Sequence, residues 1–290
     1  PYDFHETMVQ PLNALHTLPG AIDESASAAV QIALTGTDDG QLIFTKSSGK
    51  LMAWSATSPI AHAGSTERIE AFITGLCAVS ADEYVTTVAD AAGLAVYGLD
   101  APRRLIAAFQ DGTIRDIHLG SDAGDGMVYA RMDRTGDIYR IRRTQLTFAE
   151  SAGLNTLLDR FVSPVVVATL SQMRVTTVDG ETTLRIEYEN GDDNIGQRWF
   201  RDENAVTRDE FTDAYLSIIA LQFDQTAPQE AAGTSLLADV TFTLRDGSTS
   251  TVRYEACDAF YALVTTDGGG RFLVRLTDVE NMLTVLKGEK

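Results

Sequence analysis

Cysteine is scarce in this sequence, and long apolar runs are missing from it. Only two cysteines, Cys77 and Cys257, occur in 290 residues. Two thiols can build neither a disulfide framework nor a four-thiolate zinc site, so we expect both to be small buried apolar side chains. Because no run of about 18 or more apolar residues occurs, nothing in the sequence is expected to span a bilayer.

Basic residues are also few. The 23 lysines and arginines stand against 41 acidic residues, which gives a formal net charge of -18. Such an excess repels phosphate groups. The charge therefore argues against nucleic acid and against an anionic membrane surface as partners.

Motifs of catalysis and cofactor binding are missing as well. The four histidines lack the spacing of a zinc-protease helix, and the sequence has no nucleophile elbow, P-loop or dinucleotide fingerprint. The sequence therefore predicts no catalytic residue, no cofactor and no metal site, and we expect the protein not to be an enzyme.

The opening segment, residues 1–29, shows no sustained hydrophobic period, and we interpret it as a lead-in. The chain starts at Pro1 rather than at a methionine. This start suggests that an upstream segment, either a signal or a membrane anchor, has been removed.

What the sequence does contain is one pattern of strands and helices written twice. In the first copy, a helix begins at Ser65 or Thr66 and carries an apolar stripe from Ile69 to Val79. Its strands are predicted at 30–34, 41–46, around Trp54, and at 105–109, 114–119, 127–132 and 137–142.

The second copy follows in the same order. Trp199 takes the place of Trp54, and Thr207 caps a helix whose stripe runs through Phe211, Tyr215 and Ile218. Its strands are predicted at 173–177, 183–188, 198–200, 240–244, 251–255, 259–265 and 272–276.

We therefore predict an α+β fold with an internal duplication. Each copy is expected to be a meandering antiparallel sheet with one packed helix and a short closing helix. The predicted domains are the lead-in at 1–29, a first repeat at 30–164 and a second repeat at 165–290.

The stretch Tyr97, Gly98, Leu99, Asp100 and Pro102 turns the chain between helix and sheet in the first copy, and the second copy lacks it. Either the stretch serves only local geometry, or the first copy uses the turn for a further purpose.

These residues, with the "HLG" ending at Gly120 and the Val-Tyr pair at Val128, resemble the bacterial family known as domain of unknown function 4340. The resemblance covers about residues 30–146, and the second copy only through the repeat. It implies an N-terminal membrane anchor before an extracytoplasmic region, and genes that often lie beside those of ABC exporters. It implies no activity and no catalytic residues.

Acidic turns offer a possible calcium site at Asp122 and Asp125, or at Asp192 and Asp193. The loop from Asn190 fails as an EF-hand, because Ile195 and Arg201 stand where a glycine and a glutamate are needed. Such turns are most often simply solvated. His118 lies on a predicted strand, where a polar partner on a neighbouring strand is expected in preference to a metal.

A local basic cluster departs from the acidic average. It lies on the predicted hairpin at 127–142 and just beyond, and it consists of Arg131, Arg134, Arg140, Arg142 and Arg143. These arginines either pair with Asp133, Asp137 or acidic neighbours elsewhere, or dock an acidic partner or an anionic envelope polymer.

The expected function is a non-catalytic, extracytoplasmic binding or scaffolding module in the cell envelope, accessory to an ABC-type exporter. The expected partner is a membrane protein such as a transporter permease, with the membrane itself reached only through an N-terminal anchor outside this sequence. Two alternatives stay open: a cell-envelope hydrolase with a site between the repeats, and a calcium-dependent adhesion module.

Overall fold

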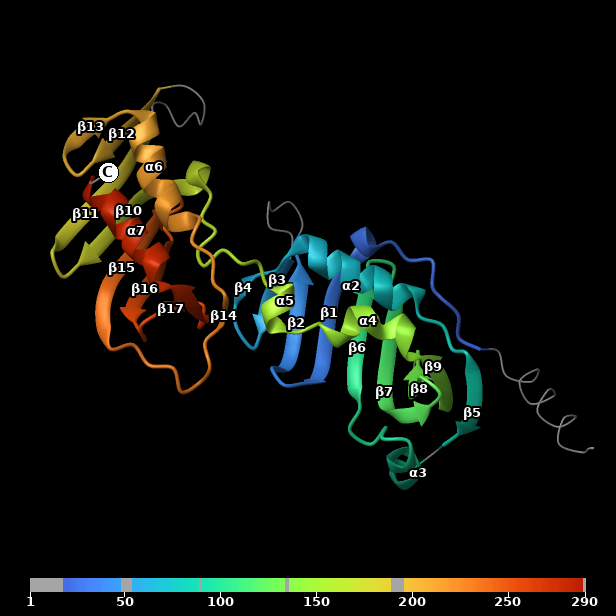
Figure 1. Cartoon of the computed structure of the whole chain (residues 1–290). Helices are drawn as coiled ribbons and strands as arrows, with labels where there is room; N and C mark the ends of the chain where they lie inside the picture. The colour runs from blue at the N-terminus through green and yellow to red at the C-terminus, as the bar shows by residue number, and fades with distance from the viewer. Residues whose placement is uncertain (1–17, 48–53, 89, 134–135, 189–195, 289–290) are drawn as a thin grey trace, which may run out of the picture. The chain divides into compact units, whose positions relative to one another are not determined.

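A computed structural model describes residues 18–47, 54–88, 90–133, 136–188 and 196–288 (Figure 1). The chain divides into two compact units, unit 1 at Pro1–Asp159 and unit 2 at Arg160–Lys290. This division falls a few residues before the boundary at 164 that the sequence suggests.

Unit 1 contains a nine-stranded antiparallel sheet in the order β4-β3-β2-β1-β6-β7-β8-β9-β5. The strands are β1 (Ala29–Thr37), β2 (Gly40–Lys46), β3 (Trp54–Ser58), β4 (His62–Ala63), β5 (Glu83–Thr87), β6 (Arg103–Phe109), β7 (Ile114–Gly124), β8 (Met127–Met132) and β9 (Asp137–Arg142).

Helix α2 (Thr66–Ala78) covers one face of this sheet (Figure 1). It begins after Ser65 and buries Ile69, Phe72, Ile73 and Leu76, as its apolar stripe predicts. The shorter helical segments of unit 1 are η1 (Ala26–Ala28), α3 (Ala91–Val96), η2 (Arg143–Leu146), α4 (Thr147–Glu150) and α5 (Leu154–Leu157).

Unit 2 repeats this sheet strand for strand, in the order β13-β12-β11-β10-β15-β16-β17-β18-β14. The strands are β10 (Leu170–Thr177), β11 (Gly180–Tyr188), β12 (Gln197–Arg201), β13 (Asn204–Val206), β14 (Gln225–Thr226), β15 (Ser235–Leu244), β16 (Thr249–Ala256), β17 (Tyr261–Thr266) and β18 (Arg271–Arg275).

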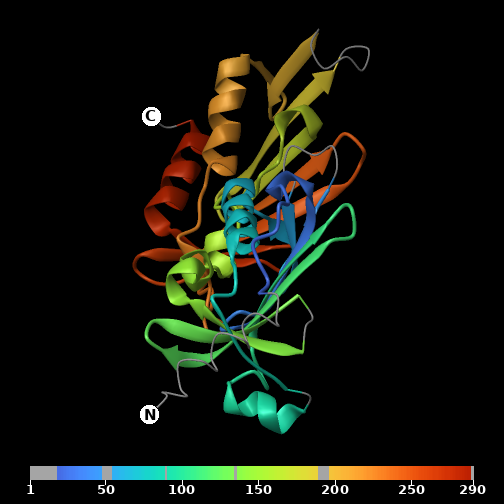
Figure 2. The same ribbon diagram turned by 90° about the vertical axis from the view of Figure 1, so that its right-hand side faces the viewer.

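Two helices pack side by side on one face of the second sheet, α6 (Arg208–Ile219) and α7 (Leu276–Lys287) (Figure 2). A capping box formed by Thr207 and Glu210 starts α6, since each side chain bonds the backbone amide of the other residue. The closing helix α7 is as long as α6, so the predicted single packed helix describes unit 2 only roughly.

The duplication reaches individual side chains. Asp111 binds the amide and hydroxyl of Thr113, and Asp246 binds Ser248 in the same way. Trp54 stands opposite Lys46 in the β2–β3 pair, and Trp199 stands opposite Ile186 at the equivalent position of the β11–β12 pair. The duplicated sheet-rich architecture predicted from the sequence is therefore confirmed.

The described part of the predicted lead-in belongs to the repeat. Ala81 donates its amide to the carbonyl of Pro19, as Phe223 donates to the carbonyl of Arg160. The 3-10 helices η1 and η3 (Val167–Thr169) follow in the two units. Each unit therefore begins with a segment that pairs with the chain after its first long helix.

Burial alternates along the central strands, which gives each sheet a core face beneath its helices and a second face, called the open face below. In unit 1 the core face carries Leu34, Leu105 and Ile117 in one cross-strand row. Arg115 also lies on the core face, fully buried, and donates to Asp133 Oδ2 at 2.5 Å and to the carbonyl of Val79 after α2. A charged residue thus ties the helix to its sheet.

Candidate functional site

The Tyr97 turn lies on the open face of unit 1. The Tyr97 carbonyl accepts a 2.8 Å hydrogen bond from the amide of Ser121 on β7, and its ring meets the ring of Tyr129 on β8 edge to face at 5.0 Å. Leu99 is buried, whereas Asp100 is exposed. These contacts therefore join the Tyr97 turn to β7 beside Gly120 and to Tyr129 of the Val-Tyr pair, in one packed cluster.

Two glycines make this contact possible. Gly98 has a φ of +67°, a conformation that favours glycine. A Cβ atom on Gly120 would lie 2.2 Å from the Tyr97 carbonyl oxygen and 3.0 Å from Leu99 Cγ. The backbone approach explains both glycines on structural grounds.

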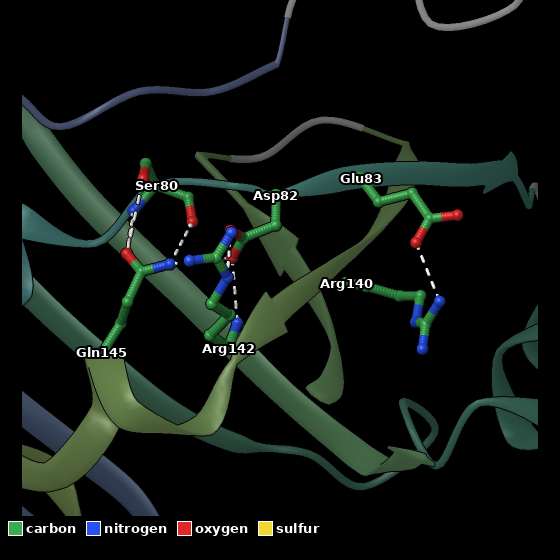
Figure 3. Close-up of polar contacts among 6 residues, drawn as sticks. All are labelled: Ser80, Asp82, Glu83, Arg140, Arg142 and Gln145. Atoms are coloured by element: carbon green, nitrogen blue, oxygen red, sulfur yellow. Dashed lines mark hydrogen bonds and ion pairs between the residues drawn. The ribbon is translucent and has the colours of Figure 1, made fainter. Parts of the chain in front are cut away.

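Arg142 belongs to a polar cluster at the end of β9 (Figure 3). Its Nε lies 3.0 Å from Asp82 Oδ1, and its amide donates to Asp82 Oδ2 at 3.0 Å. The side-chain amide of Gln145 bonds the backbone of Ser80 through both its oxygen and its nitrogen, and it also donates to Asp82 Oδ2 at 2.8 Å. The cluster joins the chain before β5 to the chain after β9.

Unit 2 repeats the central pair of this cluster. Asp224 precedes β14 as Asp82 precedes β5, and Arg275 Nε lies 3.2 Å from Asp224 Oδ2. Asp82 and Asp224 both donate their amides to the neighbouring strand, to Arg140 and Leu273 respectively. Because both units hold this pair, we assign Arg142 a structural role.

Arg140 and Arg143 have no arginine at the equivalent positions of unit 2, which hold Leu273 and Leu276. Arg140 donates to Glu83 at 2.8 Å (Figure 3), and Arg143 lies 2.6 Å from Asp122 Oδ2. The Arg143 and Asp122 side chains are 49% and 64% exposed. All three arginines from 140 to 143 thus have acidic partners outside the β8–β9 hairpin. Arg134 lies outside the described residues.

A row of basic side chains crosses the open face of unit 1. Arg104 on β6 stands opposite His118 on β7, which stands opposite Arg131 on β8. Arg140 on β9 is opposite Tyr129 on the same face. From the sequence, only the arginines on β8 and β9 could be recognised as a cluster. Arg104 and His118 join the row through the register of the paired strands, which a local sequence pattern does not contain.

Asp116 lies within the row, and its side chain is only 3% exposed. Arg104 donates to its Oδ2 at 2.7 Å, and His118 Nε2 lies 3.1 Å from its Oδ1. Burial favours the neutral acid, but the hydrogen bonds and charges of His118 and Arg104 outweigh burial and lower the pKa of Asp116 to about 2. At neutral pH this carboxylate is ionised. His118 therefore has the polar partner that its strand position suggests.

The same region of unit 2 is hollowed rather than filled. A hollow of about 630 Å³ lies over β15, β16 and β17 on the open face. Its polar lining includes Asp239, Thr251, Arg253, Glu255, Thr265 and Asp267.

Register relates the two open faces position by position. Arg104 corresponds to Asp239, His118 to Arg253, and Arg131 to Thr265. Asp133 and Asp267 also correspond, since each accepts a hydrogen bond from the amide of the residue facing it, Asp116 or Thr251. The two faces thus share one backbone frame but differ in charge.

The other candidate residues give no reactive arrangement. Cys77 is buried, and burial raises the pKa of its thiol despite the nearby charge of Arg115. His62 Nε2 lies 3.1 Å from the carbonyl oxygen of Asp159. Cys257 is half-buried and its thiol is free.

The predicted calcium turns hold no ready cation site in the described part of the chain. Asp122 already receives the amide of Gly124 and the guanidinium of Arg143, and Asp192 and Asp193 lie outside the described residues. No group of three or more His, Cys, Asp or Glu side chains among the residues described could hold a metal ion.

Comparison with known families matches the chain to the family described as "Domain of unknown function (DUF4340)", over residues 54–239. The chain belongs to this family. The match runs from β3 of unit 1 to β15 of unit 2 and so crosses the boundary between the units, further than the resemblance in the first copy indicates. No curated protein and no solved structure matches the chain. Within the described segments, no helix has the length and apolar character to cross a bilayer.

Proposed function

We propose that this member of the family is a non-catalytic binding or scaffolding module. The proposed setting, outside the cytoplasm and beside an ABC-type exporter to which the protein is tethered, comes from what the family resemblance implies. The proposed partner is a membrane protein with an acidic docking surface, such as the transporter permease.

The observation that carries this proposal is the basic row on the open face of unit 1. Four positions there hold Arg104, His118, Arg131 and Arg140, whereas the equivalent positions of unit 2 hold Asp239, Arg253, Thr265 and Leu273. The shared fold does not require this row, since unit 2 forms the same sheet with only one arginine, Arg253, at these positions. Arg104 and Arg140 bind Asp116 and Glu83 within unit 1, and we propose that the guanidinium groups of the row also attract an acidic partner.

Arg143 extends the docking surface at the end of β9. Its ion pair with Asp122 is largely exposed, and such pairs typically contribute under about 1 kcal/mol. Exchanging Asp122 for a carboxylate of a partner therefore costs little. Arg142 is excluded from the docking surface, because its pair with Asp82 is a structural feature of both units.

The test is a crosslinking pull-down from the native membrane, with the protein expressed from its complete gene. We expect recovery of the transporter permease by the wild type and its loss in the double variant Arg140→Glu, Arg143→Glu. A matched control, Arg208→Glu, makes the same kind of charge change at the exposed start of α6 and should keep the partner. Loss in the control as well, or retention in the double variant, would contradict the docking surface.

A cell-envelope hydrolase is the second candidate, and the contact between Asp116 and His118 favours it. An ionised carboxylate beside an imidazole is an arrangement that orients a general base. This candidate predicts that the protein releases soluble fragments from purified cell-envelope material and that His118→Ala abolishes the release. The binding module predicts no release by either protein.

A further inference from the structure

The hollow on the open face of unit 2 has an unbalanced charge. Its lining holds three carboxylates, on Asp239, Glu255 and Asp267, against one guanidinium. That guanidinium, on Arg253, is held by Asp239 through two hydrogen bonds of 2.8 and 3.0 Å. The carboxylates of Glu255 and Asp267 are therefore not neutralised by this bidentate pair.

Glu255 and Asp267 are both fixed in place. Asp267 accepts the amide of Thr251 at 3.0 Å. Glu255 packs against the backbone at Gly233, where an added Cβ atom would lie 2.6 Å from the glutamate side chain. No lysine or arginine of the described residues forms an ion pair with Glu255 at contact distance, although the charge of Arg253 is near enough to act on it. The site is therefore preorganised for a cation.

In unit 1 a helical turn covers the place that corresponds to Glu255. Gly120 occupies the position of Glu255, and the α3 turn lies against it through Tyr97 and Leu99. Further along the same strand, four residues before Gly120, the carboxylate of Asp116 binds the guanidinium of Arg104 at 2.7 Å. In unit 2 the connection at 227–234 forms no helix, and it meets Glu255 through Gly233.

We propose that the hollow of unit 2 binds a basic polypeptide segment from a partner, with an arginine or lysine side chain paired to Glu255. The segment lies in the hollow over β15, β16 and β17, and its cation supplies the ion-pair partner that no lysine or arginine of the described residues gives Glu255. The hydroxyls of Thr251 and Thr265 are placed to bond its polar groups. This surface is separate from the basic docking surface of unit 1 and takes a partner of opposite charge.

The test uses the whole, isotope-labelled protein at low ionic strength, where charge pairs are least screened. The probe is a capped heptapeptide of alternating arginine and serine, and a glutamate and serine peptide is its control. We expect saturable amide shift changes at Thr251, Arg253 and Thr265 with the arginine peptide only. Shift changes confined to other surfaces would overturn the proposal.

Two variants and a small amine make the result specific. Glu255→Gln keeps the side-chain shape and should weaken peptide binding about fivefold, the effect of about 1 kcal/mol. Asp213→Asn removes one charge from α6 on the helix-covered face and should leave binding unchanged. Equal binding by all three proteins would overturn the site. Binding of agmatine as tightly as the peptide would show a small-amine site and overturn the polypeptide partner.

Discussion

At the residue scale, the same charged side chains perform different tasks in the two units. Arg142 and Arg275 hold a structural aspartate in both units, whereas Arg140 and Arg143 have no arginine counterpart in unit 2. The sequence predicted the basic cluster but not this division, because Glu83 lies 57 residues before its partner Arg140. Such pairing depends on strand order, which a local pattern does not contain.

Protonation of Asp116 should affect the stability of unit 1. Its folded pKa of about 2 lies below the ordinary value of 3.8, so its contribution is present above about pH 4 and is lost as the pH falls towards 2. Its size is about 2 kcal/mol. We therefore expect Asp116→Asn to lower the free energy of unfolding by about that amount at pH 7, and by less at pH 3, in urea titrations.

A control for this prediction is Asp125→Asn. The Asp125 side chain is 96% exposed, and its positive φ of 55° suits asparagine equally well. This variant should match the wild type at both pH values. A cost for Asp116→Asn that does not change with pH would contradict the ionic role of Asp116.

At the scale of elements, the amphipathic helices and the central strands were predictable. Strands β8 and β9 lie at 127–132 and 137–142, as the alternation predicts. The sequence pattern did not predict β4, β5, β13, β14 or α3. Two-residue strands such as β4 and β14 carry no period, and the sequence AAGLAV of α3 has no apolar stripe. These elements are fixed by tertiary contacts instead.

The Gly120 contact gives a prediction for one such element. In Gly120→Ala the new methyl group collides with the Tyr97 carbonyl, so the α3 turn must move off the sheet. We expect a loss of about 1–3 kcal/mol in stability, the usual cost of overpacking, and faster amide exchange at residues 94–99. The measurements are thermal unfolding and hydrogen exchange by mass spectrometry.

Gly136→Ala is the matched control, since its Cβ atom would meet only Thr87 Cγ2 at 3.7 Å. Its exchange at residues 94–99 should equal that of the wild type. If both alanine variants behaved alike, the close packing of the Tyr97 turn on β7 would be wrong.

At the scale of the whole molecule, one sheet topology has been used twice and given two open faces of different character. The face of unit 1 carries a basic row, and the face of unit 2 carries a hollow rich in carboxylates. Sequence periodicity predicted the duplication, since both copies need the same core. Periodicity could not predict which side chains the two open faces carry. These residues alternate with the core residues along each strand and are free to differ between the units.

From the difference between the two open faces we infer that function resides on these faces and not beneath the helix layer. The most direct test of this inference places a photocrosslinking residue in the native host at Ile106 or Thr241, on the open faces, and at Glu70 or Asp213, on α2 and α6. We expect specific adducts with partner proteins from positions 106 and 241 and none from positions 70 and 213. Adducts formed only from the helix positions would contradict it.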